Sequence, residues 1–84
     1  MIAVDGNAIG GALYEFYGHE MTGAIGVCAS CGASAHVAQL VVYETGAGAV
    51  ARCPTCGAVL IVAVVLRGET KVDIRGLAAL EGVR

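Results

Sequence analysis

The sequence predicts an α+β domain in which one N-terminal helix precedes a small antiparallel sheet closed by a metal ion. Three observations lead there: apolar residues at helical spacing near the start, β-branched segments separated by turn signals, and four cysteines arranged as two pairs. The chain has 84 residues, enough for one small domain. We therefore assign residues 1–84 to a single domain, with the helix at 5–17 and the metal-stapled sheet at 21–75.

The composition is unusually apolar for so short a chain. Hydrophobic residues make up 57%, charged residues make up 14%, and the mean hydropathy is +0.77. This balance excludes intrinsic disorder, which needs low hydrophobicity and high charge. The chain has no Trp, and most of its apolar residues are Ala and Val. These side chains bury little area, so at about 25 cal/mol per Å² each contributes little to stability. Domains of this size often need a metal or disulfides for stability.

The first element is a helix over residues 5–17. Asp5 or Asn7 can accept hydrogen bonds from the free amides of its first turn. Apolar side chains recur at spacings of four and three, which places them on one helix face: Ile9, Leu13 and Phe16. Gly10 and Gly11 weaken the helix by about 1 kcal/mol each, so we expect it to depend on docking.

The remaining elements are strands, predicted at residues 21–27, 37–43, 49–52, 58–66 and 71–75. Segment 58–66 is continuously apolar and β-branched, which favours a buried central strand. A turn signal at 44–48 separates strands 37–43 and 49–52, and another at 67–70 separates strands 58–66 and 71–75. The apolar tail at 76–80 fits either a strand or a helical turn.

The cysteines form two copies of the motif Cys-x-x-Cys-Gly, Cys28/Cys31 and Cys53/Cys56, with 21 residues between Cys31 and Cys53. Two intervening residues let one tight turn direct both sulfurs at one ion, and the following glycine permits the positive φ that closes the turn. A hairpin of strands 37–43 and 49–52 fills the gap. Two such turns facing each other make a closed site of four sulfurs, the structural type for zinc, and hence a small zinc ribbon.

Three chemistries compete for these sulfurs, and we expect one structural Zn²⁺ per chain. An iron site of rubredoxin type is the alternative, because rubredoxin has the same pair of motifs. Rubredoxins, however, pack an aromatic core around the iron, whereas this chain has three Tyr and one Phe. A dithiol redox role needs only one pair, and no thioredoxin-like pattern surrounds either pair.

The charge distribution argues against a nucleic-acid partner. The formal net charge is −2 and the five basic residues are scattered, whereas nucleic-acid binders cluster Lys and Arg. The longest apolar run, 58–66, is too short for a membrane-spanning helix, which needs about twenty residues. The N-terminus lacks the pattern of a signal peptide. We expect a reducing cytoplasm, where paired cysteines favour metal over disulfides.

No catalytic arrangement emerges from the other polar residues, so we do not expect an enzyme. His19 and His36 fit surface positions, although His36 could also replace a metal ligand or hydrogen-bond to a cysteine sulfur. Ser30 and Ser34 have no base at a suitable spacing. Four cysteine ligands also leave no open position on the metal for hydrolysis.

Two polar segments, 5–8 and 73–77, interrupt the apolar chain. A helix cap explains the first and a charged strand face explains the second, but both could also contact a protein partner. A domain this small cannot hide all of its Val, Leu and Ile side chains, and an exposed apolar patch usually marks an interface. We therefore expect a protein partner or self-association.

The combined motifs resemble a family of small actinobacterial proteins of about this length, catalogued as a domain of unknown function. The residues that carry the resemblance are Asp5, Gly6, Asn7, Ala8, Cys28, Cys31, Arg52, Cys53, Pro54, Cys56, Asp73, Arg75, Gly76 and Leu77. The resemblance implies a zinc-ribbon-like protein. The paired motifs also look like the zinc domain of nickel-hydrogenase maturation factors, but Ile2 stands where those proteins have a nickel-binding His.

The sequence thus predicts a non-catalytic zinc protein that acts as an interaction or accessory module. The first alternative is a rubredoxin-like iron electron carrier that serves an oxidoreductase. A nucleic-acid-binding zinc ribbon is disfavoured by the charge.

Overall fold

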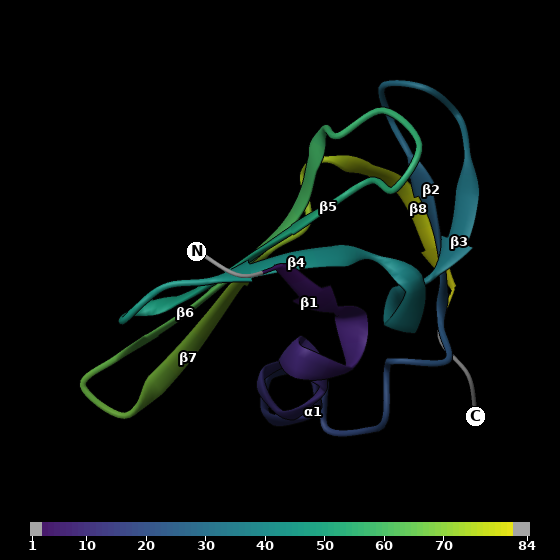
Figure 1. Ribbon diagram of the computed structural model, residues 1–84. Helices are drawn as coiled ribbons and strands as arrows, with labels where there is room; N and C mark the ends of the chain where they lie inside the picture. The colour runs from purple at the N-terminus through teal and green to yellow at the C-terminus, as the bar shows by residue number, and fades with distance from the viewer. Residues whose placement is uncertain (1–2, 82–84) are drawn as a thin grey trace.

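The computed structural model describes residues 3–81 and has the predicted α+β architecture of one helix with antiparallel sheets (Figure 1). In chain order the elements are β1 (Ala3–Asp5), the 3₁₀ turn η1 (Gly6–Ile9), α1 (Gly10–Tyr17), β2 (Ile25–Cys28), β3 (Ser34–His36), the 3₁₀ turn η2 (Val37–Gln39), β4 (Val41–Glu44), β5 (Gly48–Arg52), β6 (Val59–Leu66), β7 (Glu69–Asp73) and β8 (Leu77–Glu81).

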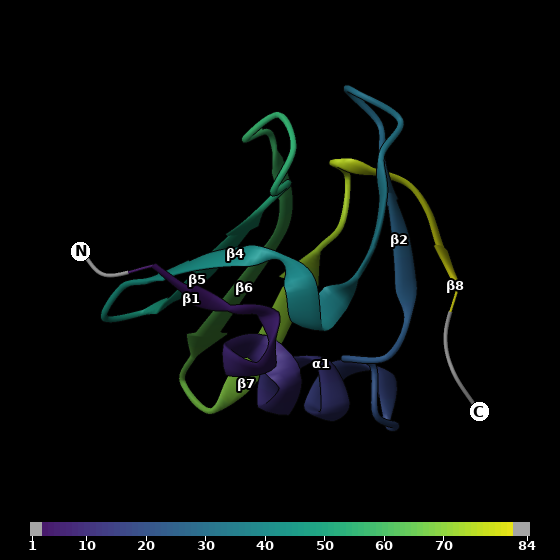
Figure 2. The ribbon, with the colours of Figure 1, turned by 45° about the vertical axis from the view of Figure 1, so that its right-hand side comes forward.

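The strands form two sheets rather than the single sheet expected over 21–75. The larger sheet has the order β1-β4-β5-β6-β7 and the smaller has the order β3-β2-β8, with antiparallel pairing throughout. β1 and β8 lie outside residues 21–75, so the predicted sheet bounds were too narrow. Helix α1 and the smaller sheet lie on the same side of the larger sheet (Figure 2), where they cover one of its faces.

The predicted helix at 5–17 is in fact a 3₁₀ turn followed by an α-helix. The Asp5 carboxylate accepts a hydrogen bond from the Asn7 N–H at 3.1 Å, as expected of a cap. Ile9 and Leu13 are buried, but Phe16 is 49% exposed, so its assignment to the core face was wrong. Tyr17, four residues after Leu13 on the same helix, packs against the core instead.

The predicted strand 37–43 is divided by a turn. Residues 37–39 form η2, and β4 begins only at Val41. The turn lies directly against η1: an ideal Cβ built on Gly6 would stand 1.6 Å from the Val37 carbonyl oxygen. This backbone contact is non-local, so strand propensity alone misassigned residues 37–39. Similarly, β2 begins at Ile25 rather than at residue 21, after a turn closed by the Ala24 N–H donating to the Met21 carbonyl.

Strands β5, β6 and β7 form the expected meander, joined by registers such as Val50 with Val62 and Val62 with Asp73. β6 lies beside the central strand β5 and is only partly buried, which corrects the prediction of a buried central strand. Its Ile61 is fully buried, whereas Leu66 is 52% exposed. The undecided tail is a strand, since β8 pairs with β2.

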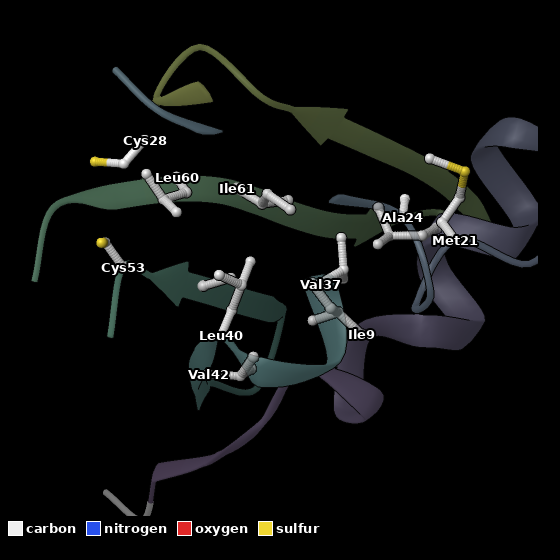
Figure 3. Close-up of a cluster of buried hydrophobic side chains, with 12 residues drawn as sticks. Ile9, Met21, Ala24, Cys28, Val37, Leu40, Val42, Cys53, Leu60 and Ile61 are labelled. Carbon is white, nitrogen blue, oxygen red and sulfur yellow. The ribbon is translucent and has the colours of Figure 1, made fainter. Parts of the chain in front are cut away.

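The core lies between the covered face of the larger sheet, α1 and the smaller sheet. It is built from small and medium apolar side chains: Ile9, Leu13, Met21, Ala24, Cys28, Val37, Leu40, Val42, Ala51, Cys53, Leu60 and Ile61. Figure 3 shows Cys28 and Cys53 at one end of this cluster, beside Leu60. The core therefore ends directly on two of the predicted metal ligands. Within residues 3–81, no helix is long and apolar enough to cross a membrane.

Candidate metal centre

The four predicted ligands come together at one end of the molecule. Cys28 ends β2 and Cys31 lies in the turn before β3, while Cys53 follows β5 and Cys56 lies in the turn before β6. All four Sγ atoms lie within 4.8 Å of one another. Within residues 3–81 this is the one cluster of three or more potential metal-ligating side chains. We call residues 28–32 knuckle 1 and residues 53–57 knuckle 2.

The two knuckles have the same backbone geometry. In knuckle 1 the Gly32 N–H donates to the Cys28 carbonyl at 2.9 Å, and the Cys28 N–H donates to the Ala33 carbonyl at 2.9 Å. The equivalent bonds of knuckle 2, Gly57 to Cys53 and Cys53 to Ala58, have the same lengths. Both glycines have positive φ, +78° at Gly32 and +81° at Gly57. This conformation suits glycine, which explains the repeated Cys-x-x-Cys-Gly motif.

The sulfur separations fit a tetrahedral metal ion. The Cys28 Sγ lies 3.7 Å from the Cys56 Sγ, and the Cys31 Sγ lies 3.7 Å from the Cys53 Sγ. A Zn–S bond of about 2.3 Å gives a tetrahedron edge of about 3.8 Å. A disulfide would instead bring two sulfurs to about 2.05 Å, and all four cysteines are free. The donor set of four soft sulfurs suits zinc or iron.

The first and second cysteines of each knuckle differ in exposure. Cys28 and Cys53 are 1% and 4% exposed, whereas Cys31 and Cys56 are exposed. Backbone amides point at the buried sulfurs: the Ser30 N–H lies 3.3 Å from the Cys28 Sγ, and the Thr55 N–H lies 3.4 Å from the Cys53 Sγ. Such amides stabilise thiolate charge and orient the ligands.

The pKa values of Cys28 and Cys53 shift in the opposite direction to that of Cys31. The Cys31 N–H, helped by the Ser30 N–H, holds the pKa of Cys28 below its usual value. The Cys56 N–H, helped by the Thr55 N–H, lowers the pKa of Cys53 to about 6. The Ala33 N–H acts to lower the pKa of Cys31, but burial and the neighbouring sulfurs outweigh it and raise that pKa to about 12. Each close sulfur pair thus contains one buried thiol whose pKa is lowered, and metal binding displaces protons from thiols that are still protonated.

The histidines lie outside this cluster. His19 and His36 are both exposed, and neither belongs to the group of side chains that could hold a metal. The His36 N–H donates to the Gln39 carboxamide oxygen at 2.9 Å, so this residue begins η2.

The two polar segments singled out from the sequence have structural roles. Asp5 caps η1, as described above. Asp73 accepts the Arg75 N–H at 2.9 Å and the Arg75 Nη2 at 2.6 Å, so the turn after β7 is closed by its own side chains. Arg75 holds the pKa of the Asp73 carboxyl below its ordinary value, chiefly by this side-chain hydrogen bond.

That turn also fixes knuckle 1. The Gly76 carbonyl accepts a hydrogen bond from the Ala29 N–H at 3.0 Å. An ideal Cβ on Gly76 would stand 1.9 Å from the Val59 carbonyl oxygen, so only glycine fits at this contact. The segment at 73–77 therefore joins the larger sheet to knuckle 1.

Arg52 holds knuckle 2, a role that the sequence reasoning missed. Its Nη1 donates to the Gly57 carbonyl at 3.0 Å, and its guanidinium lies 5.9 Å from the centroid of the Tyr43 ring. The position of Arg52 directly before Cys53 could have indicated this role from the sequence. Its proximity to Tyr43 could not, because it depends on the pairing of β4 with β5.

Comparison with known proteins places the chain in a family without assigned activity. A family model described as "Family of unknown function (DUF6510)" matches residues 1–83. Searches of curated proteins and of solved structures gave no significant match. The match confirms the resemblance to a family of unknown function that the sequence motifs indicate.

Proposed function

We propose that this chain, which belongs to the DUF6510 family of unknown function, is a non-catalytic zinc-binding protein that acts as a small protein–protein interaction or accessory module. The observation that carries the proposal is the cluster of four cysteine sulfurs at one end of the core. In such a site the metal-binding free energy contributes directly to folding.

The ligand set supports a structural rather than a catalytic metal. Catalytic zinc sites keep one position open for water or substrate, whereas four thiolates fill a tetrahedral ion. The core also needs this contribution, because its largest fully buried side chains are aliphatic, such as Ile9, Leu13 and Ile61, with no aromatic ring among them.

The larger sheet supports the interaction role. Side chains alternate along its strands, so the residues between the buried ones point away from the core. These residues form what we call the outer valine face: Val41, Tyr43, Val50, Val62 and Val64. No described element covers this face (Figures 1 and 2). Uncovered apolar surface of this kind supports a protein partner or a second copy of the chain.

A second candidate function, an iron electron carrier serving an oxidoreductase, is favoured by the exposure of Cys31 and Cys56. Sulfur ligands at the surface shorten the path for an electron, and N–H···S bonds tune the potential of an iron–thiolate centre. A nucleic-acid partner is less favoured, since Lys71 and Arg75 are already paired with Glu69 and Asp73. A reducing cytoplasm fits either candidate, because it keeps the ligands as thiols.

The metal test is elemental analysis, with a visible absorption spectrum, of protein purified without added metal. One zinc per chain and a colourless sample support the proposal. Iron with a thiolate charge-transfer colour would overturn it in favour of electron transfer, and the reduction potential would then be measured.

The interface test is sedimentation velocity combined with binding of an apolar dye. We expect the wild-type protein to self-associate or to bind dye, and Val62→Glu on the outer valine face to reduce both. Ala78→Glu is the matched control, because Ala78 is exposed on β8 in the other sheet. A wild-type monomer that binds no dye contradicts an exposed interaction surface.

A further inference from the structure

A pocket of about 530 Å³ lies on the outer valine face beside knuckle 2. Its lining is mixed: an aromatic ring, an aliphatic side chain, a hydroxyl, a guanidinium and a backbone segment of the knuckle. These groups belong to Tyr43, Val50, Thr45, Arg52 and Gly57, respectively. The volume falls within the range of about 300–1,000 Å³ typical of small-ligand sites.

The Arg52 guanidinium is held in place before any ligand arrives. The hydrogen bond to the Gly57 carbonyl fixes one nitrogen, and the Tyr43 ring, 5.9 Å away, supports the planar group from the side. A guanidinium has five N–H donors, so most of them remain free for a ligand. Because less freedom is lost on binding, a fixed guanidinium binds more tightly than a mobile one.

Arg52 also has no carboxylate partner within residues 3–81. The ion pairs of the described residues join Lys71 to Glu69 and Arg75 to Asp73. Among the described residues, Arg52 is the only charged side chain that lines this pocket, and it stands beside the apolar Val50 and the Tyr43 ring. The pocket is therefore a local cationic site on a chain whose formal net charge is −2.

We propose that this pocket binds a carboxylate attached to an apolar group. The planar fork of an arginine matches a carboxylate in a bidentate arrangement. One guanidinium balances one negative charge, which favours a carboxylate over a phosphate dianion. The apolar body of the ligand lies against Val50 and the Tyr43 ring. The Thr45 hydroxyl, which donates to the Gly48 carbonyl at 3.3 Å, can accept a hydrogen bond from a polar group of the ligand.

The pocket shares a residue with the metal centre. Gly57 directly follows Cys56, and its carbonyl accepts the hydrogen bond from Arg52, so the pocket and the proposed metal centre share this backbone segment. If metal binding to knuckle 2 strengthens carboxylate binding, linkage requires that a bound carboxylate stabilises the metal-loaded knuckle to the same extent. The inference does not depend on whether the metal is zinc or iron.

The test is a titration of the full-length, metal-loaded protein, with its metal content measured beforehand, followed by two-dimensional ¹H–¹⁵N NMR. The probes are phenylacetate and its neutral analogue phenylacetamide. We expect saturable shifts of the amide signals of Tyr43, Thr45, Val50, Arg52 and Gly57. Phenylacetamide and inorganic phosphate should bind at least about tenfold more weakly than phenylacetate.

Arg52→Gln removes the cation, and we expect it to weaken phenylacetate binding by about tenfold or more. Arg67→Gln is the matched control: Arg67 also lacks a carboxylate partner in residues 3–81 but lies in the β6–β7 turn, outside this pocket. Tyr43→Leu removes the supporting ring while leaving the Gly57 bond, and should weaken binding several-fold. Metal content and spectral dispersion are checked for each variant.

A second titration, with a peptide, distinguishes the source of the carboxylate. The probe Ala-Val-Ala-Val-Phe is compared with a free and an amidated C-terminus. If the free peptide binds about tenfold more tightly than phenylacetate, the ligand is a protein chain terminus and the pocket is part of the proposed interaction surface. Equal or weaker binding assigns a free small carboxylate.

The inference is overturned if phenylacetate gives no saturable shifts, if phenylacetamide or phosphate binds as well as phenylacetate, or if Arg52→Gln binds as well as wild type. The first two comparisons use the wild-type protein, so they decide the matter even if a variant fails to fold. None of these outcomes bears on the metal analysis or on self-association, so the proposed function is tested separately.

Discussion

Knuckle 1 and knuckle 2 share the same turn but are joined to the rest of the fold by different bonds. Knuckle 1 is held by backbone, through the Ala29 N–H and the Gly76 carbonyl. Knuckle 2 is held by a side chain, through Arg52 and the Gly57 carbonyl. The comparison teaches that the local motif determines the turn itself, whereas the bond that holds it comes from a distant segment in knuckle 1 and from the residue before the motif in knuckle 2.

The difference between the two attachments has a consequence for ligand binding. Backbone bonding packs the attachment of knuckle 1 closely against Val59. Side-chain bonding places a charged group on the outer valine face beside knuckle 2. We therefore expect changes at knuckle 1 to act mainly on stability, and changes beside knuckle 2 to act on binding as well.

The largest expected effect is the loss of both knuckles when one cysteine is replaced. Cys28→Ser and Cys53→Ser should each leave a chain that does not retain metal and does not fold cooperatively. The free energy of binding a structural Zn²⁺, about 10–16 kcal/mol, matches or exceeds the whole stability of a small domain, about 5–15 kcal/mol. Elemental analysis and thermal unfolding followed by circular dichroism measure the two losses.

Ser30→Ala is the control for these variants, because it alters knuckle 1 without removing a sulfur. It should retain one metal per chain and unfold as wild type does. A soluble, metal-free Cys53→Ser protein with a cooperative transition would contradict the idea that the metal staples the fold.

The second effect separates the two attachments. Gly76→Ala places a Cβ 1.9 Å from the Val59 carbonyl oxygen, so the backbone beside knuckle 1 must move. We expect a loss of about 3 kcal/mol in the free energy of unfolding, typical of backbone clashes in packed regions. Urea unfolding of the metal-loaded protein measures it.

The matched control is Gly46→Ala in the β4–β5 turn, where an added Cβ meets nothing within 4 Å. Its effect should stay within about 0.5 kcal/mol. Equal stabilities of the two variants would show that the Gly76 contact does not hold knuckle 1.

The third effect tests the likeness of the knuckles. Gly32→Ala and Gly57→Ala each force an L residue into positive φ, where no side-chain clash adds to the cost. Each should lower the free energy of unfolding by about 1–2 kcal/mol. If the turns are equivalent, urea unfolding gives the same loss of stability for both variants. A difference between the two losses of more than about 1–2 kcal/mol would show that the turns are not equivalent.

The smallest effect concerns the side-chain attachment. Arg52→Gln removes the bond to the Gly57 carbonyl, and we expect a loss of about 1 kcal/mol. Metal transfer to a coloured chelator should accelerate several-fold, because knuckle 2 opens more easily. Arg67→Gln should leave the transfer rate unchanged, and equal acceleration in both variants would indicate a general effect of charge.

The sequence predicted the site better than the fold around it. The clustering of the four cysteines follows from spacing and local turn chemistry, and the structure brings all four sulfurs together. The division into two sheets was not predictable, because it depends on β8 pairing with β2 across half the chain. Residues 37–39 were misassigned for a related reason, since η2 lies against the distant backbone of Gly6.

The apolar strand β6 has a consequence for the life of the chain before it acquires metal. Its eight residues, Val59–Leu66, contain no charge and no proline, the signature of a segment that assembles into cross-β aggregates when exposed. In the folded protein β7 pairs with it and carries Glu69, Lys71 and Asp73 at the edge, charges that discourage further strand addition. If metal stabilises the fold as we propose, its removal takes this protection away, and we expect the metal-free chain to aggregate through β6.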